Sequence, residues 1–582
     1  MKKFSIKGFF KSLTDSEAIR WIAKNAKGQW FSISLLTFLN VLLAGASIVV
    51  SYMLKNVVNS ATGVYGAEVA TRMSNITFWG VMFALVVLAQ FAMTILSNHL
   101  VFRITARLTI DMKTSLYDKI LRKSYSQITK YHTGEMLNRL NNDVTTISNA
   151  ITALIPGVVY TFAKLIGIFV VLFTIDPLFT VLFLAVGIFA FVITTIFKKK
   201  MKNYHKQIFE TDGKVRSFMQ ETLSSLLVIK IFNAEDKVVE SASDLQEINY
   251  KRKKKRNFIS IATQCLFSLA FNAAYIFGLI YCAVKIANND PVVTYGVLSQ
   301  VLSLISQISV PIRSLTAIIP TYYGAIASAE RIIEFENMDD EPVLNESNID
   351  FNVLYENLDT IEFKDIVFKY DRDVIFNNTN LTVNKGDLIV MTGISGIGKS
   401  TLTKLLLGVF PLESGEIYLK LKDGSKILVD RNIRRLFSYV PQGNFLLSGT
   451  LRENIAFIKD DATDEEIWQA VHFACADFIH ELPEGLDTVI GEKGLGLSEG
   501  QVQRVAIARA ILSGAPVVLL DEATSALDEA TELKLLQNIK TLSNKTCILI
   551  SHKKAANAVC NKEVRIIDGK IVVIENNEKS KD

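Results

Sequence analysis

The stretch Gly393-Ile-Ser-Gly-Ile-Gly-Lys-Ser-Thr401 decides the fold of the second half of the chain. It fits the phosphate-binding pattern G-x-x-x-x-G-K-[ST], in which glycines let backbone amides approach phosphate oxygens closely. The apolar run 387–392 before it is typical of a strand, and residues 401–408 after it are typical of a helix. This order predicts a nucleotide cradle, because loop amides and a helix N-terminus both attract anionic phosphate.

Each polar residue of this loop has a predicted task. We expect Lys399 to reach the β- and γ-phosphates of ATP and Ser400 to offer its hydroxyl to Mg²⁺. The loop residues expected to bind ATP around them are Gly393, Ser395, Gly396, Gly398 and Thr401. The alternative is a chance turn of glycine and serine before a helix, and the strand and helix on either side argue against it.

An apolar run that ends in two carboxylates, Pro516-Val-Val-Leu-Leu-Asp521-Glu522, predicts the catalytic part of the same site. Buried parallel strands deliver side chains at their carboxyl ends, where α/β proteins place their chemistry. We expect Asp521 to hold Mg²⁺, directly or through water, and Glu522 to orient and deprotonate the attacking water. Simple helix caps are the alternative for this pair of acids. Tyr370 ends an earlier strand-like run and is suited to stacking on adenine, although tyrosines at strand ends are common.

The first half of the chain holds nearly all of its long charge-poor runs. Overall, 49% of the 582 residues are hydrophobic and the mean hydropathy is +0.28, which is high for a soluble protein. The net charge of +5 gives no general reason to expect nucleic-acid binding, and we predict none. The five cysteines form no C-x-x-C pair and no zinc-binding spacing, so we expect reduced thiols.

Six segments of the first half are long and apolar enough to cross a membrane, which takes about 20 residues. They are residues 28–54, 73–102, 144–175, 177–197, 257–284 and 291–312. Lysines and arginines concentrate in the N-terminal arm and in the second-to-third and fourth-to-fifth connections. The positive-inside rule therefore predicts a multi-pass protein of the cell membrane with both termini and the nucleotide site in the cytoplasm.

The two long basic connections have a helical pattern, because apolar residues recur at helical spacing with charges between them. We expect them to continue the membrane helices and to turn back at 130–134 and at 232–236. These turns are either places where a soluble motor domain is contacted or simply loop tips. The basic run 251–256 suggests nucleic-acid binding by composition alone, but at the foot of a span it favours anchoring at anionic membrane lipids.

A further motif, Leu497-Ser-Glu-Gly-Gln501, precedes a strongly helical run. It is similar to the L-S-G-G-Q signature of the ABC transporter family, and nearly the whole chain resembles an exporter-type half-transporter of that family. The resemblance implies an all-α domain of six transmembrane helices with long cytoplasmic extensions, joined to an α/β P-loop nucleotide-binding domain. The corresponding layout is an arm at 1–29, a membrane domain at 30–335, a linker at 336–355 and an ATP-binding cassette at 356–582.

Three more matches follow in the order that the family has them. Val440-Pro-Gln442 resembles the glutamine loop, which implies that Gln442 contacts Mg²⁺ and senses the γ-phosphate. Ile550-Ser-His552 resembles the switch region, which implies a catalytic contact between His552 and the γ-phosphate. Ser525-Ala-Leu-Asp528 resembles the D-loop that crosses the dimer interface. The turns at 130–134 and 232–236 fall where family members carry coupling helices.

In this family the phosphate loop of one cassette binds ATP against the signature helix of another, so the resemblance implies a second half-transporter. A homodimer is favoured, and a heterodimer is the alternative. The residues implied to act on the partner's ATP are Ser498, Gly500, Gln501 and Asp528. Glu499 departs from the pattern, which has glycine there. Because the contacting Ser498 and Gly500 are present, we expect a tuned rather than an inactive site.

The predicted function is ATP-driven export of an amphiphilic molecule (a lipid, peptide or drug). The alternatives are an ATP-gated channel or regulator, or an importer, on the same fold. Lys164 lies near the middle of a span, where a charge is costly and marks a candidate functional site. The other residues expected to line a substrate cavity with it are Arg313, Gln300, Ser303, Ser306 and Gln307. The alternative is that Lys164 pairs with a neighbouring polar group or carbonyl.

Overall fold

The computed structural model describes residues 16–66, 68–342, 349–370, 373–443, 446–491, 494, 496–542, 544–567 and 569–575. The chain divides into two compact units. The first comprises residues up to 118 together with Thr133–Asn337, and the second comprises Lys119–His132 together with residues from Met338 onward. Residues 119–132 fall within the predicted membrane domain (30–335), and in the structure they are compact with the second unit.

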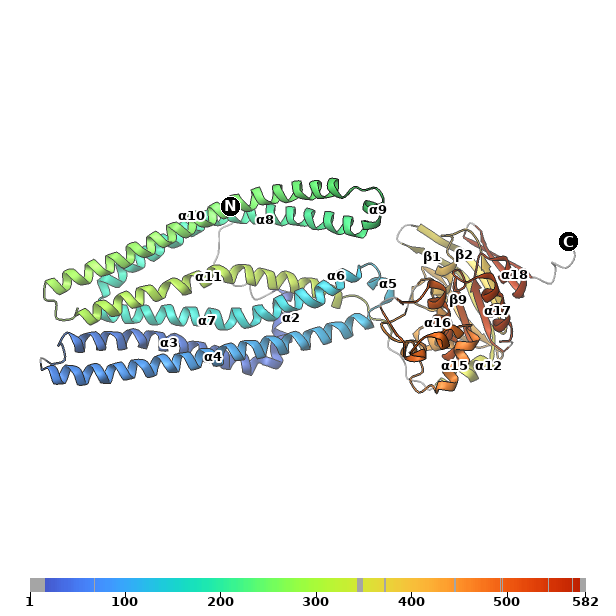
Figure 1. Cartoon of the computed structure of the whole chain (residues 1–582), viewed down its shortest axis with the longest axis horizontal. Coiled ribbons are helices and arrows are strands. Elements are labelled where there is room, and N and C mark those ends of the chain that lie inside the picture. Colours follow the sequence, from blue (N-terminus) through green and yellow to red (C-terminus); the bar gives the residue numbers. More distant parts are fainter. Residues whose placement is uncertain are drawn as a thin grey trace. The chain divides into compact units, whose positions relative to one another are not determined.

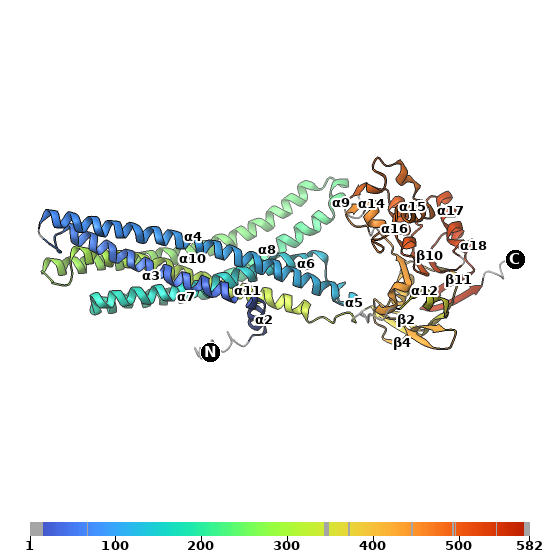
Figure 2. The ribbon, with the colours of Figure 1, turned by 90° about the horizontal axis from the view of Figure 1, so that it is seen from below.

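Long helices make up the first unit (Figure 1). Their bounds are α2 (Glu17–Ala26), η1 (Lys27–Gln29), α3 (Trp30–Ala61), α4 (Val69–Arg122), α6 (Thr133–Asn138), η2 (Arg139–Asp143), α7 (Val144–Ile175), α8 (Pro177–Ser224), α9 (Leu226–Ile231), α10 (Glu235–Ala287) and α11 (Tyr295–Glu336). Helices α3, α7 and α11 pack against one another. Helix α8 pairs with α10 in a hairpin closed by the short α9, and both views show this pairing (Figure 2).

The predicted spans all lie on these helices. Among the described residues, four helical stretches are long and apolar enough to cross a membrane: Glu17–Ala61, Val69–Arg122, Thr133–Ile175 and Glu235–Ala287. The fourth and sixth predicted spans lie on α8 and α11, where many side chains fall outside the described residues, so as spans they remain predictions. Only 6% of the most apolar stretch of α4 is buried, as expected for a helix whose side chains contact lipid.

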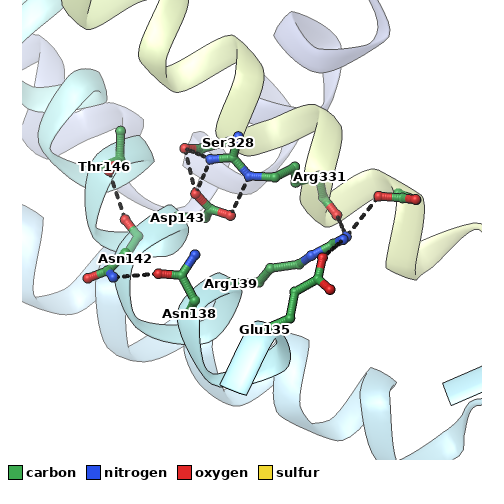
Figure 3. A network of polar contacts seen from close by, with 9 residues as sticks. Glu135, Asn138, Arg139, Asn142, Asp143, Thr146, Ser328 and Arg331 are labelled. Atoms are coloured by element: carbon green, nitrogen blue, oxygen red, sulfur yellow. Dashed lines mark hydrogen bonds and ion pairs between the residues drawn. The ribbon is translucent and has the colours of Figure 1, made fainter. Parts of the chain in front are cut away.

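A buried polar cluster joins α11 to the start of α7 (Figure 3). Asp143 is 3% exposed and accepts hydrogen bonds from the Ser328 hydroxyl (2.8 Å) and the Arg331 Nε (2.9 Å). Arg139, also 3% exposed, donates to Glu334 on α11 (2.9 Å). Arg139 and Asp143 bound a one-turn π-helix, a form of helix that is frequent at functional sites. Two buried charges therefore fix the last turns of α11.

All of the described strands lie in the second unit. They are β1 (Leu358–Tyr370), β2 (Asp373–Asn384), β3 (Leu388–Thr392), β4 (Ser414–Leu421), β5 (Lys426–Leu428), β6 (Phe437–Val440), β7 (Gly449–Thr450), β8 (Val489–Ile490), β9 (Val517–Asp521), β10 (Thr546–Ile550), β11 (Lys562–Ile567) and β12 (Lys570–Glu575). The helical elements are α5 (Tyr125–Ile128), α12 (Phe351–Glu356), α13 (Lys399–Leu406), η3 (Arg431–Leu436), α14 (Leu451–Ile455), α15 (Asp464–Phe473), η4 (Asp477–Glu481), η5 (Gly485–Asp487), α16 (Glu499–Leu512), α17 (Glu529–Lys540) and α18 (Lys554–Val559).

The central sheet has the order β12-β11-β3-β10-β9-β6. All neighbours are parallel except the β11–β12 pair. Strands β1, β2, β4 and β5 form a separate antiparallel sheet. In the register of the central sheet, Ile550 pairs with Asp521 and with Met391, and Val440 pairs with Leu520. The carboxyl ends of β3, β6, β9 and β10 therefore lie at one edge, as expected for a site in an α/β fold.

The central sheet separates two apolar cores. Along β9 and β10, successive side chains alternate between the cores, because neighbouring residues of a strand point to opposite faces. Leu520 and Leu549 belong to the core shared with α16 and α17. Leu519 and Ile548 belong to the core shared with α13 and the antiparallel sheet. Burial on both faces makes this edge rigid, so it can hold catalytic side chains in fixed positions.

Candidate functional site

The phosphate loop joins β3 to α13, as predicted. Its glycines Gly393, Gly396 and Gly398 have φ values of 145°, 83° and 111°, a region that favours glycine. A Cβ at Gly398 would lie only 2.5 Å from the Cγ2 atom of Ile375, so space as well as backbone geometry requires glycine there. Helix α13 begins at Lys399, two residues before the predicted start, and its first amides face the loop.

Lys399 is held inside this loop. Its ammonium donates to the carbonyl oxygens of Gly393 (2.9 Å) and Ile394 (3.0 Å), and the residue is 5% exposed. Burial lowers the pKa of Lys399, while the nearby charges of Glu522 and Asp521 oppose that shift. An anion bound by the loop amides would therefore meet a cation that is already in position.

Ser400 and Asp521, both predicted to hold Mg²⁺, are in direct contact. The Ser400 hydroxyl donates to one carboxylate oxygen of Asp521 (2.9 Å), and the Tyr439 hydroxyl donates to the other (3.1 Å). Asp521 is 1% exposed, and burial raises the pKa of its carboxyl group. Oxygen donors of this kind suit Mg²⁺, and a bound divalent cation would offset the cost of burying the carboxylate. The residues present therefore fit the ion.

Glu522 follows β9, and two other predicted site residues, Gln442 and His552, lie beside its carboxylate. Its φ of 51° lies in the left-handed region, a strain that structures retain mostly at functional positions. Its backbone amide donates to the Ile550 carbonyl of β10 (3.1 Å). One carboxylate oxygen accepts a hydrogen bond from the Gln442 amide (2.7 Å), and the other lies 3.6 Å from the Nε2 atom of His552. The structure thus brings Gln442, Glu522 and His552 together at the sheet edge.

Tyr370, predicted to stack on adenine, is 37% exposed at the end of β1. Its ring meets Phe410 edge-on with 5.5 Å between centroids, and Phe410 meets Tyr125 of α5 in the same way at 5.7 Å. Phe410 thus connects the expected base-binding tyrosine to the segment 119–132. Sequence reasoning missed Phe410, whose one signal was its place just after the helix of the phosphate loop.

The linker residue Glu341 makes a second connection between the region of the phosphate loop and the segment 119–132. Its carboxylate pairs with Arg434 (2.9 Å), and its backbone amide donates to the Arg122 carbonyl (2.9 Å). Arg434 in turn donates through Nε to the carbonyl of Leu407, just past the end of α13 (3.0 Å). The helix that begins in the phosphate loop is therefore joined through two side chains to the segment that precedes α5.

Replacing Phe410 by leucine tests the aromatic connection. We expect the KM for ATP to rise about 2- to 10-fold and the preference for ATP over CTP to fall, because Tyr370 loses an edge-to-face partner that contributes about 0.5–1.5 kcal/mol. Steady-state ATPase assays with both nucleotides measure this, and Phe410→Tyr should retain the wild-type preference. An unchanged preference in the leucine variant would show that Phe410 does not position Tyr370.

The signature motif begins α16 with a reciprocal cap. The amide of Gln501 donates to the Ser498 hydroxyl (3.3 Å), and the Ser498 amide donates to the Gln501 side chain (2.8 Å). Glu499 is exposed in the first turn, where the helix dipole favours a negative charge. This cap explains why the helix forms with glutamate in place of glycine.

The signature helix is tied to the D-loop. A Cβ at Gly500 would lie 2.8 Å from the Ala526 carbonyl oxygen, so this close approach requires glycine. The side chain of Gln503 donates to the Ser525 hydroxyl (2.9 Å) and accepts from the Ala526 amide (3.1 Å). Sequence reasoning missed Gln503, since nothing in its local pattern distinguishes it from any other polar residue of a helix.

The residues expected to act on a partner's ATP stay apart from the phosphate loop. Among the described residues, no hydrogen bond or ion pair joins Ser498, Gly500 or Gln501 to residues 393–401. Asp528 caps its own helix α17 by accepting from the Thr531 amide (2.9 Å). Their action in trans remains a prediction.

Family models and sequence relatives identify the family of this chain. The family model of the ABC transporter transmembrane region matches residues 33–312, and the ABC transporter model matches residues 376–525. An ATP-dependent lipid A-core flippase from Desulfotalea psychrophila is 31% identical over 471 residues, which cover 79% of this chain and 80% of that protein. The chain belongs to the ABC transporter family.

Other relatives agree with this assignment. A protein of the same description from Syntrophus aciditrophicus is 29% identical over 477 residues, covering 80% of this chain and 77% of that protein. A solved structure of a bacterial Atm1-family ABC exporter with ATP bound has the same fold, with a TM-score of 0.77 at 23% identity, and covers 93% of this chain and 94% of that one. This ABC transporter thus joins a membrane domain to an ATP-hydrolysing cassette, and its fold is that of an ABC exporter.

The structure describes only some of the residues that were predicted to line a substrate cavity. Lys164 is 7% exposed, its ammonium lies 3.4 Å from the Tyr160 hydroxyl, and no carboxylate among the described residues pairs with it. The side chain of Arg313 lies outside the described residues. Two of the polar residues of α11 contact α3, because Ser51 bonds both the Ser303 hydroxyl (2.9 Å) and the Gln307 amide (2.7 Å). That these residues line a substrate cavity remains a prediction.

Proposed function

We propose that this ABC transporter is a homodimeric exporter in the cell membrane, with its cassettes in the cytoplasm, that moves an amphiphilic lipid, peptide or drug outward. The observation that carries the proposal is the meeting of Gln442, Glu522 and His552 beside the Ser400–Asp521 pair, in a chain whose other half consists of long apolar helices. Such a site is built for ATP hydrolysis, and the apolar helices are what hydrolysis would move.

In the proposed cycle, the phosphate loop and Lys399 bind the triphosphate and Tyr370 binds the base. Bound Mg²⁺ would neutralise part of the phosphate charge. Glu522 orients a water molecule and accepts its proton, with its carboxylate held by Gln442 and close to His552. Ser498 and Gly500 of a second copy would complete the site, so ATP favours the closed pair of cassettes and biases the membrane domain between its two states.

Transport in inside-out vesicles tests this function. Fluorescent lipids, peptides and drugs are screened for uptake that requires ATP hydrolysis, with Glu522→Gln as the inactive control. Uptake of a substrate by the wild type alone supports export. Flux that persists in Glu522→Gln would instead indicate an ATP-gated channel, and ATP-driven loss from preloaded vesicles would indicate an importer. ATPase activity of the purified chain without a second half-transporter distinguishes a homodimer from a heterodimer.

Lys164 is the residue we propose for recognition of an acidic group on the substrate. Because it lies buried within the membrane domain without a described carboxylate partner, a negatively charged substrate would gain by contacting it. Lys164→Gln should therefore abolish most of the substrate-stimulated part of ATPase activity and leave the basal part unchanged. Unchanged stimulation would assign Lys164 to its contact with Tyr160 alone.

A further inference from the structure

The hairpin of α8 and α10 holds a cavity of about 560 Å³ that has no part in nucleotide binding. Helix α8 contributes Tyr204 and Gln207 to its lining, and α10 contributes Lys251, Arg252, Lys255 and Ile259. Three of these side chains are cationic, and none of the described residues that line the cavity is acidic. A cavity with this lining is a candidate site for an anion.

One of the cations is fixed in place. The Arg252 guanidinium donates to the Gln207 carbonyl (2.9 Å) and to the Thr211 hydroxyl (2.9 Å), both on α8. These bonds tie α10 to α8 across the cavity wall. Because both acceptors are neutral, the charge of Arg252 is positioned there without being cancelled.

The two lysines lie one helical turn apart on the same face of α10. Like charges at this spacing repel each other. Within the part of the chain that the structure describes, Lys251 pairs weakly with the Glu247 carboxylate at 3.7 Å, and both side chains of that pair are more than half exposed. Among the described residues, no carboxylate lies within ion-pair distance of Lys255. An anion placed between the lysines would remove this repulsion.

The cavity lies where the charged part of α10 meets its apolar part. The charge-free run 257–284 begins two residues after Lys255, and Ile259 lines the apolar end of the cavity. In the proposed orientation, this boundary is at the cytoplasmic surface of the membrane. A ligand with an anionic head and an apolar tail matches both ends of the cavity, whereas a free anion matches only the basic end.

We propose that this cavity binds the phosphate headgroup of an anionic membrane lipid. The proposal rests on the proposed membrane orientation but not on the transported substrate. Lys251 and Lys255 contact the phosphate, the guanidinium of Arg252 adds a fixed charge, and the acyl chains follow α10 past Ile259. A lipid bound in this way bridges α8 and α10 near the base of the hairpin that carries α9.

Native mass spectrometry of the full chain, released from nanodiscs of phosphatidylcholine with phosphatidylglycerol, tests the site without ATP. The double variant Lys251→Gln/Lys255→Gln should retain at least fivefold less phosphatidylglycerol than the wild type. The matched control is Lys237→Gln/Lys254→Gln, which makes the same change of charge at exposed α10 residues that do not line the cavity. The control should retain the wild-type amount.

Two results would overturn the proposal. One is equal retention by the cavity variant and the control, which would show that general surface charge holds the lipid. The other is displacement of the lipid by millimolar inorganic phosphate, which would show a site for a soluble anion. Because the measurement involves neither transport nor hydrolysis, it can fail while the exporter function holds. Transport can equally fail while the lipid site holds.

Discussion

Glu522→Gln is expected to lower ATP hydrolysis by about 10²–10⁴-fold, the range typical for loss of a general base, without weakening ATP binding. The glutamine can still bond with Gln442, so the geometry at the end of β9 should survive. What it cannot do is accept the proton of the attacking water. ATPase rates and the affinity for a fluorescent ATP analogue, measured on the same preparation, separate these two effects.

The control for this variant is Glu529→Gln, which removes the same charge from an exposed position in the first turn of α17. It should hydrolyse ATP at the wild-type rate. A Glu522→Gln enzyme that keeps more than a tenth of the wild-type rate would exclude Glu522 as the base. The strained backbone at Glu522 makes the substitution to glutamine preferable to alanine, because glutamine preserves the contacts that hold this conformation.

The catalytic edge of the cassette could be predicted from sequence because its signals are local. The phosphate loop and the run that ends in Asp521 each carry their chemistry at the end of a strand, and parallel strands place those ends together. Gln442 and His552 carry no such local signal, and only the resemblance to a family pointed to them. The structure then shows their positions, each two residues beyond the end of its strand.

The contacts that join the nucleotide site to the segment 119–132 could not be predicted from the sequence, because they depend on residues far apart in the chain. Tyr125 and Phe410 meet across 285 positions of sequence. The helical pattern of the first long connection predicted its turn near 130, where the structure has a turn after α5. That pattern contains nothing about the packing of α5, so it gave no reason to expect that 119–132 would be compact with the second unit.

Arg331→Ala is expected to destabilise the membrane domain by about 2–4 kcal/mol, because it leaves the buried carboxylate of Asp143 without its cation (Figure 3). Breaking a fully buried pair typically costs about 3–5 kcal/mol. We expect a smaller loss of stability here because the Arg331 side chain is 46% exposed and Ser328 still donates to Asp143. The midpoint of thermal inactivation in one detergent, compared with the wild type, measures the loss.

The matched control is Arg107→Ala, which breaks an exposed pair with Asp111 on α4 and should cost less than about 1 kcal/mol. Adding Asp143→Asn to Arg331→Ala removes the stranded charge and should recover part of the stability. The midpoint of thermal inactivation decides this. If it falls equally in the Arg107 and Arg331 variants, or does not rise again in the double variant, the cluster is not a buried ion pair. Because α11 ends at Glu336 and the chain enters the second unit at Met338, loosening the cluster should also lower the substrate transported per ATP hydrolysed.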